Sequence, residues 1–174
     1  MQFNKTVKNH MLLGCIQLMK EDDTPEHRTM FLSELENSEF YAPALVTPEP
    51  VTDPITGDMT LDPKSKIQFP MLPTTDGRCF LMAFTDDTEY QKWVDKNAQL
   101  PKFVMNLEDF AGMMFVPDAQ GKEAPAIGLV INPLGCNVVI PRELLAGIYA
   151  GKLPEVQEYI HRQSQMQKND SETD

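Results

Sequence analysis

Prolines crowd into one stretch of this chain, and that stretch sets the first limit on how it folds. Seven of the 14 prolines lie between Pro43 and Pro73. Because proline fixes φ and removes a backbone donor, these residues cannot form one continuous helix. Residues 47–65 are therefore predicted to form a long loop with at most a small hairpin, whose turn signal stands at residues 56–58. The regular elements are expected on either side of this loop.

The residues before the loop have the spacing of a helical hairpin. Residues 7–20 place apolar side chains on one helical stripe, and Thr24 followed by Pro25 is typical of the start of a second helix. A short acidic turn separates the two helices, so we predict a helical hairpin over about residues 7–37. The apolar positions of its first helix are Met11, Leu12, Cys15, Ile16 and Met19.

Two hairpins are predicted after the loop. Asp76 and Gly77 separate the alternating residues 67–72 from the nearly continuous apolar run Cys79–Phe84, which is typical of a central strand. Further on, the turn Asn132–Gly135 joins two strands rich in β-branched residues. These strands cover residues 126–131 and 137–140, and two more short strands are predicted at Tyr41–Val46 and Lys102–Met105.

Helix starts follow several of these strands. Either Asp86 or Thr85 caps a helix, and Asn106 caps the next. Pro141 and Pro154 open two more helices near the end of the chain. The pattern predicts an α+β fold: a mainly antiparallel sheet with helices packed on one face, preceded by the helical hairpin. We expect one domain over residues 1–162 and a disordered acidic and polar tail over residues 163–174.

The charge balance excludes two classes of partner. Lysine and arginine number 15 against 26 aspartates and glutamates, which gives a net charge of −11. Nucleic acids and anionic membranes need a basic surface, so neither is an expected partner. No apolar run approaches the roughly 18 residues of a membrane span.

The residues that commonly carry chemistry show no catalytic or metal-binding spacing. Cys15, Cys79 and Cys136 are far apart, which predicts three reduced thiols, no disulfide and a cytoplasmic location. We expect no cofactor and no metal. The histidines His10, His27 and His161 are predicted to lie at the surface of terminal helices, and the loop aspartates Asp53, Asp58 and Asp62 lack the spacing of a calcium loop.

Acidic pairs at helix starts have a structural explanation. The macrodipole of a helix favours negative charge in its first turn. Asp86 and Asp87 stand at one predicted helix start, and Glu108 and Asp109 stand at the next. Either pair serves its helix without any catalytic role.

Four motifs in order resemble a known family. They are Met71–Asp86 with its Asp-Gly-Arg turn, Tyr90–Trp93, Gly128–Pro133 and Val139–Leu145. In this order they resemble the N-terminal domain of the bacterial SseB (enhanced serine sensitivity) proteins, over about residues 7–150. The resemblance implies the same domain type in a bacterial protein, and it assigns no catalytic residue.

Two function hypotheses follow. The first is a non-catalytic cytoplasmic protein that binds another protein, as a regulator or accessory factor. The second is a small-ligand-binding protein or enzyme with a site between two turns. Both use the same candidate binding residues: Phe84, Thr85, Asp86, Asp87, Asn132, Pro133, Leu134 and Gly135. Asp86 and Asp87 favour a protein partner of basic character. The oligomeric state is left open.

Overall fold

A four-stranded sheet organises the fold. The computed structural model describes residues 5–55, 59–98, 100–117 and 124–171, with side chains up to Gln165. The sheet has the order β10-β9-β7-β6. Its strands are β6 (Met71–Pro73), β7 (Cys79–Ala83), β9 (Ala126–Ile131) and β10 (Val138–Pro141).

Both predicted hairpins are present in this sheet, but the first is shorter than predicted, because residues 66–68 pair with residues 45–47 instead of with β7. β6 pairs antiparallel with β7, and β9 pairs antiparallel with β10. Gly77 takes a φ of +80° in the first turn, where its amide donates to the Thr74 carbonyl at 3.1 Å. The middle pair, β7 and β9, is parallel because a long crossover connects the two strands. The sheet is therefore mainly antiparallel, as predicted.

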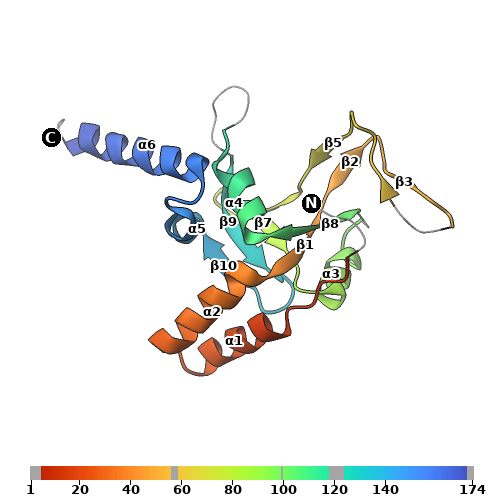
Figure 1. Ribbon diagram of the computed structural model, residues 1–174, viewed down its shortest axis with the longest axis horizontal. Helices are drawn as coiled ribbons and strands as arrows, with labels where there is room; N and C mark the ends of the chain where they lie inside the picture. Colours follow the sequence, from red (N-terminus) through yellow and green to blue (C-terminus); the bar gives the residue numbers. More distant parts are fainter. Residues whose placement is uncertain (1–4, 56–58, 99, 118–123, 172–174) are drawn as a thin grey trace.

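A second ribbon extends the sheet. β1 (Glu39–Pro43) pairs antiparallel with β8 (Lys102–Asn106). Tyr41 and Phe84 exchange two backbone hydrogen bonds of 2.9 Å, which join β1 to the chain just beyond the end of β7 (Figure 1). The bridge places the residues after β7 beside the N-terminal part of the chain.

The predicted helical hairpin is present. It consists of α1 (His10–Glu21) and α2 (Pro25–Asn37). Thr24 caps α2, because its hydroxyl accepts from the His27 amide at 3.2 Å. One core prediction for α1 is wrong: Met11 is 66% exposed, since it lies beside rather than on the stripe that faces the sheet.

The proline-rich loop forms a projecting arm built from two small ribbons. β2 (Leu45–Thr47) pairs with β5 (Lys66–Gln68), and β3 (Val51–Thr52) pairs with β4 (Met59–Thr60). Figure 1 shows the arm extending away from the helices. The turn signal predicted at residues 56–58 lies outside the described residues.

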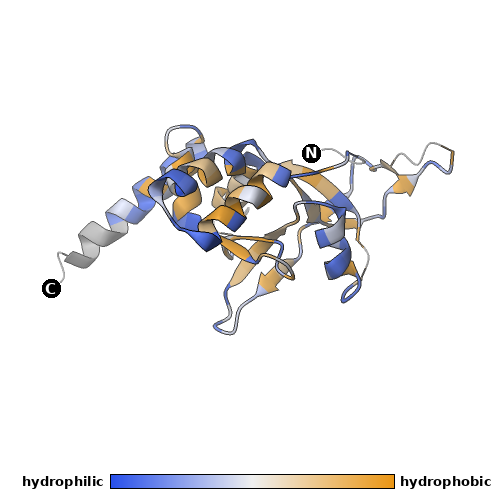
Figure 2. Cartoon of the chain, turned by 90° about the horizontal axis from the view of Figure 1, so that it is seen from below, coloured by the Kyte–Doolittle hydropathy of each residue, from blue (hydrophilic) through white to orange (hydrophobic). Residues whose placement is uncertain are grey.

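Apolar side chains pack on both faces of the sheet. Leu81 and Ala83 of β7 lie in a large core with α1, α2, α4 (Leu107–Phe115), α5 (Arg142–Tyr149) and α6 (Pro154–Ser171). Met82 and Phe84 lie in a smaller core on the other face. Figure 2 shows hydrophobic residues concentrated on the strands and on the helix sides that face them.

The prediction that the helices cover one face is wrong for one helix. α3 (Asp87–Val94) packs Tyr90 and Trp93 into the smaller core, opposite the other helices. The physical reason is the continuous apolar run of β7: a strand that is apolar on both sides needs cover on both sides.

The end of the chain also differs from the sequence-based expectation. Disorder was expected from residue 163, whereas the structure continues α6 as helix to Ser171. No proline or glycine follows Pro154 before Ser171, so nothing in the chain forces the helix to stop. Across the described ranges, no helix is both long enough and apolar enough to cross a membrane.

Candidate functional site

The two turns predicted as a binding surface meet through one side chain. Asn132 follows β9 with a φ of +50°, a left-handed conformation that asparagine tolerates. Its Oδ1 accepts from the Thr85 amide at 3.0 Å, and its Nδ2 donates to Thr85 Oγ1 at 2.8 Å. Its own amide donates to the Ala83 carbonyl at 2.9 Å. These bonds lock the turn after β9 to the turn after β7.

Asp86 continues this network into α3. Its Oδ1 accepts from the Glu89 amide at 2.9 Å, which makes Asp86 the N-cap. Thr85 Oγ1 donates to Asp86 Oδ2 at 3.0 Å and so supports the cap without being it. Of the two candidates from the sequence, the structure selects Asp86.

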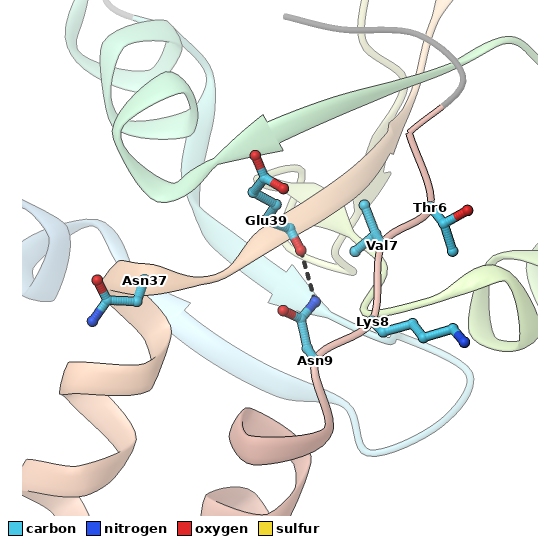
Figure 3. A pocket seen from close by; sticks show the side chains of 6 residues that line it. All are labelled: Thr6, Val7, Lys8, Asn9, Asn37 and Glu39. Carbon is cyan, nitrogen blue, oxygen red and sulfur yellow. Dashed lines mark hydrogen bonds between the residues drawn. The ribbon is translucent and has the colours of Figure 1, made fainter.

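The N-terminal segment covers part of the same region. Asn9 Nδ2 donates to the Thr85 carbonyl at 3.0 Å and to the Glu39 carbonyl at 2.7 Å. Figure 3 shows Asn9 directed at β1, with Val7 and Lys8 following the segment beside it. A polar cleft of about 570 Å³ lies here, lined by Thr6, Val7, Lys8, Asn9, Asn37 and Glu39.

Asp87 is less available as an acidic group than the sequence suggests. The Lys102 ammonium forms an ion pair with its carboxylate. The same ammonium lies 3.9 Å from the centre of the Tyr41 ring and 5.2 Å from that of Tyr90. The Tyr41 hydroxyl also accepts from the Val7 amide at 2.9 Å. The acidic turn is therefore partly neutralised by a lysine held over two aromatic rings.

Glu89 occupies the space between α3 and the second turn. Its carboxylate lies against the Gly135 backbone, where the carboxyl carbon is 2.8 Å from the position that a Cβ would take. Lys92 pairs with the other side of this carboxylate at 2.5 Å. A Cβ at position 135 would require the end of the Glu89 side chain to move.

Burial divides the eight predicted site residues into two groups. Phe84, Thr85 and Asn132 are fully buried and therefore cannot touch a partner directly. Their role in the structure is to pack and to join the turns. The exposed or half-exposed remainder, called the two-turn ridge below, comprises Asp86, Asp87, Pro133, Leu134 and Gly135.

A second surface was missed by the sequence analysis. Phe80 of β7 and Leu72 of β6 are directly opposite each other, so their side chains share one face of the sheet. Ile127 and Val139 continue this apolar strip on β9 and β10. Leu72 is 36% exposed and Val139 is 45% exposed. We call these four residues the open sheet face.

The signal for this surface was present in the sequence. Phe80 lies between Cys79 and Leu81, and Val139 lies between Val138 and Ile140, so each strand is apolar on both sides. An eight-residue helix, α3, is too short to cover all of the second side. The apolar residues of this face that α3 does not cover therefore stay exposed to solvent.

A cleft of about 310 Å³ borders the open sheet face. Arg142 begins α5 at its rim, where its guanidinium lies 4.5 Å from the Tyr159 ring centre and donates to the Met114 carbonyl at 2.9 Å. The lining residues are Arg78, Phe80, Ile127, Val139, Pro141, Arg142, Glu143 and Tyr159.

Shifted pKa values near these surfaces have structural causes. Burial raises the pKa of the Tyr90 phenol, whose hydroxyl donates to the Leu100 carbonyl at 2.6 Å. Burial also raises the pKa of the Cys79 thiol. Hydrogen bonds from Thr74 and Arg78 lower the pKa of Asp76. These groups lie in different places and do not form an acid–base pair in one pocket.

The loop aspartates serve their own backbone. Asp53 Oδ1 accepts from the Ile55 amide, and Asp62 Oδ1 accepts from the Lys64 amide, each at 2.7 Å. Asp58 lies outside the described residues. Within the described part of the chain, no three His, Cys, Asp or Glu side chains gather as metal ligands would.

Comparison with known proteins identifies the domain type. The family model for the SseB protein N-terminal domain matches residues 15–147, which is more than half of the chain. The match includes the two-turn ridge and the open sheet face. Neither the curated proteins nor the solved structures contain a match to the chain.

Proposed function

The chain belongs to the family of SseB protein N-terminal domains, and from this premise we propose that it is a non-catalytic protein-interaction module. Its partner binds the open sheet face. One observation carries the proposal: an apolar strip on the central sheet, including Leu72 and Val139, stays exposed beside the half-buried Phe80 and Ile127. Apolar strips rimmed by polar residues are typical of surfaces that bind other proteins.

The two-turn ridge is the second contact in this proposal. It presents Leu134, which is 41% exposed, together with Asp86 and Asp87. Asn132 and Thr85 hold the ridge rigid from below, as a scaffold holds a binding loop. A partner of basic character would complement the two carboxylates, although Lys102 already pairs with one of them.

The rival function, a small-ligand-binding protein or enzyme, needs room between the two turns. The Glu89 carboxylate fills the space next to Gly135, and Asn132 bonds directly to Thr85. This packing supports the interaction module over the rival. We further propose a bacterial cytoplasmic setting, which the three free cysteines support.

Site-specific photo-crosslinking tests the open sheet face. A photoreactive amino acid replaces Val139 in one variant and Val116 in a control variant. The two valines are matched in exposure, at 45% and 48%, and Val116 lies at the end of α4. In the source cells we expect a discrete crosslinked protein from position 139 and none from position 116. Equal crosslinking at both positions, or none at 139, would refute the proposed surface.

Charge reversal tests the ridge separately. Asp87→Lys is expected to weaken capture of the crosslinked partner while changing the free energy of unfolding by only about 1 kcal/mol. Asp95→Lys, at the other end of α3, is the control for the added charge. If both variants capture the partner as the unmodified protein does, the ridge has no role in binding.

A further inference from the structure

The cleft beside the open sheet face contains features that define the chemistry of a partner. Its floor is apolar, formed by Phe80, Ile127 and Val139. At about 310 Å³ it is large enough for one bulky side chain. The cleft therefore favours a partner segment with a large aliphatic or aromatic residue.

The charge at the rim differs from that of the molecule as a whole. The chain has a net charge of −11 and only four arginines, and two of them, Arg78 and Arg142, line this cleft. Phe115 and Tyr159 hold the Arg142 guanidinium at 5.1 Å and 4.5 Å from their ring centres. Glu143 also lines the cleft and Arg142 is only 8% exposed, so Arg78 is the guanidinium of this rim that a partner can reach.

Arg78 has the exposure needed to reach a partner. Its side chain is 62% exposed. Asp76 accepts from its Nε at 2.7 Å, which holds the guanidinium close to the end of β7. The ion pair with Asp76 offsets part of the Arg78 charge, but it also holds the guanidinium in place, so a partner can bind it at low conformational cost.

The neighbouring edge of the sheet favours an extended segment. Among the described residues, β10 pairs only with β9. The Ile140 carbonyl lies 2.5 Å from where a Cβ of Gly128 would stand, so the Ile140 backbone faces β9. By strand alternation, the backbone groups of Val139 face the open edge. An extended peptide can add to such an edge through main-chain hydrogen bonds.

Resting on the proposed function, we infer that the segment bound at the open sheet face is an extended peptide that combines apolar and acidic side chains. An apolar side chain of the peptide lies on Phe80, Ile127 and Val139, and a carboxylate of the peptide pairs with the exposed Arg78. The cleft lies at the opposite end of the β9–β10 hairpin from the two-turn ridge. One partner can therefore place acidic residues here and basic residues at the ridge.

Fluorescence anisotropy with two labelled peptides tests this chemistry. One peptide alternates glutamate with leucine, and the other alternates lysine with leucine at the same length. The glutamate peptide is expected to bind the full chain, with a Kd that rises with ionic strength. Arg78→Glu is expected to raise that Kd by about tenfold or more.

Arg28→Glu is the matched control. Arg28 is equally exposed, at 61%, and likewise pairs with a single aspartate, Asp23, in the turn between α1 and α2. The Arg28→Glu variant should leave the Kd of the glutamate peptide unchanged. Arg78→Ala serves as a second variant if the reversed charge loosens the turn beside Asp76, and melting curves identify that case.

The outcomes separate this inference from the proposed function. Equal Kd values for the Arg78 and Arg28 variants, or tighter binding of the lysine peptide, would overturn the inferred chemistry. If the lysine peptide binds and Val139→Asp abolishes its binding while Val116→Asp does not, the open sheet face still binds proteins but prefers basic ones. If position 139 also fails to crosslink, the proposed surface itself is wrong.

Discussion

Asn132 shows how one residue determines the relation between two distant segments. Its left-handed backbone turns the chain after β9, and its side-chain amide bonds to Thr85, which is 47 positions earlier. Both residues are buried, so these hydrogen bonds are shielded from water. Asn137 has the same φ of +50° but is exposed, which makes it a natural comparison.

Replacing Asn132 with alanine should destabilise the fold by about 3 kcal/mol. Two buried bonds to Thr85 are lost, and alanine is strained at positive φ. Asn137→Ala should cost only about 1 kcal/mol, because the backbone strain is the same but the exposed site has no buried Thr85 partner. Urea denaturation of both variants measures the difference. Equal losses would mean that the Asn132–Thr85 bonds contribute nothing.

Tyr149 is a residue whose environment predicts a pH response. It lies buried in the large core, near Glu36, Glu108 and Asp109. Burial, followed by these carboxylates, raises its pKa to about 12. An unfolded tyrosine has a pKa of about 10, so the folded state holds this proton more tightly than the unfolded state.

Stability should therefore fall as the pH rises from about 10 to about 12. The contribution from Tyr149 is complete below the unfolded pKa and is lost as the pH rises through the folded value. Tyr149→Phe has no phenol to ionise and should show a smaller loss across this range. Free energies of unfolding at pH 8 to 11.5, compared between the two proteins, check the prediction. Parallel pH profiles would show that another group controls alkaline unfolding.

Element α6 has two parts with different roles. Val156 is fully buried, and Tyr159 packs against Phe115 with tilted rings whose centres are 5.0 Å apart. Among the side chains of α6 that the structure describes, Ile160 is the last apolar one packed against the large core. Figure 1 shows the C-terminal half of the helix projecting away from the other elements. The first half of α6 should therefore provide most of the stability that this helix gives to the fold.

Removing residues 163–174 should leave the melting temperature within about 2 °C of the full chain, because none of the described side chains in this segment packs in the core. Val156→Ala should instead cost about 2 kcal/mol by opening a cavity between α6 and the core. Differential scanning calorimetry measures both. A large drop on truncation would show that the projecting half stabilises the fold.

At the scale of the whole molecule, β7 and β9 link the two cores. Leu81 and Leu129 belong to the large core, while Met82 and Val130, their neighbours in sequence, belong to the smaller one. Each strand is shared, so neither core can lose its strands without disrupting the other. None of the described residues between 47 and 65 is buried, so this segment of the arm stands apart from the coupling.

The described domain should unfold in a single transition. Trp93 is the only tryptophan in the chain and lies in the smaller core, so its fluorescence reports that core. Far-UV circular dichroism reports mainly the helices of the large core. Both signals should change at the same denaturant concentration. Different unfolding midpoints for the two signals would contradict the coupling of the two cores. A stable proteolytic fragment ending near residue 40 would contradict it too. Proteolytic cleavage within residues 47–65 is expected and would not contradict it.

Local chemistry made most elements predictable. Asp76 and Gly77 specify a turn, Thr24 and Pro25 start a helix, and Asn106 caps another, because each acts on residues within four positions of itself. The family motifs likewise predicted the domain type. The sequence by itself therefore determined the hairpins, the helix starts and the α+β class.

Only the tertiary structure decided which residues can meet a partner. The sequence pointed to the two turns, but it could not show that Asn132 is buried against Thr85 or that Lys102 neutralises Asp87. It also could not show that α3 leaves Leu72 and Val139 exposed. Burial, charge pairing and uncovered surface depend on contacts between residues far apart in the chain, and local spacing alone does not determine those contacts.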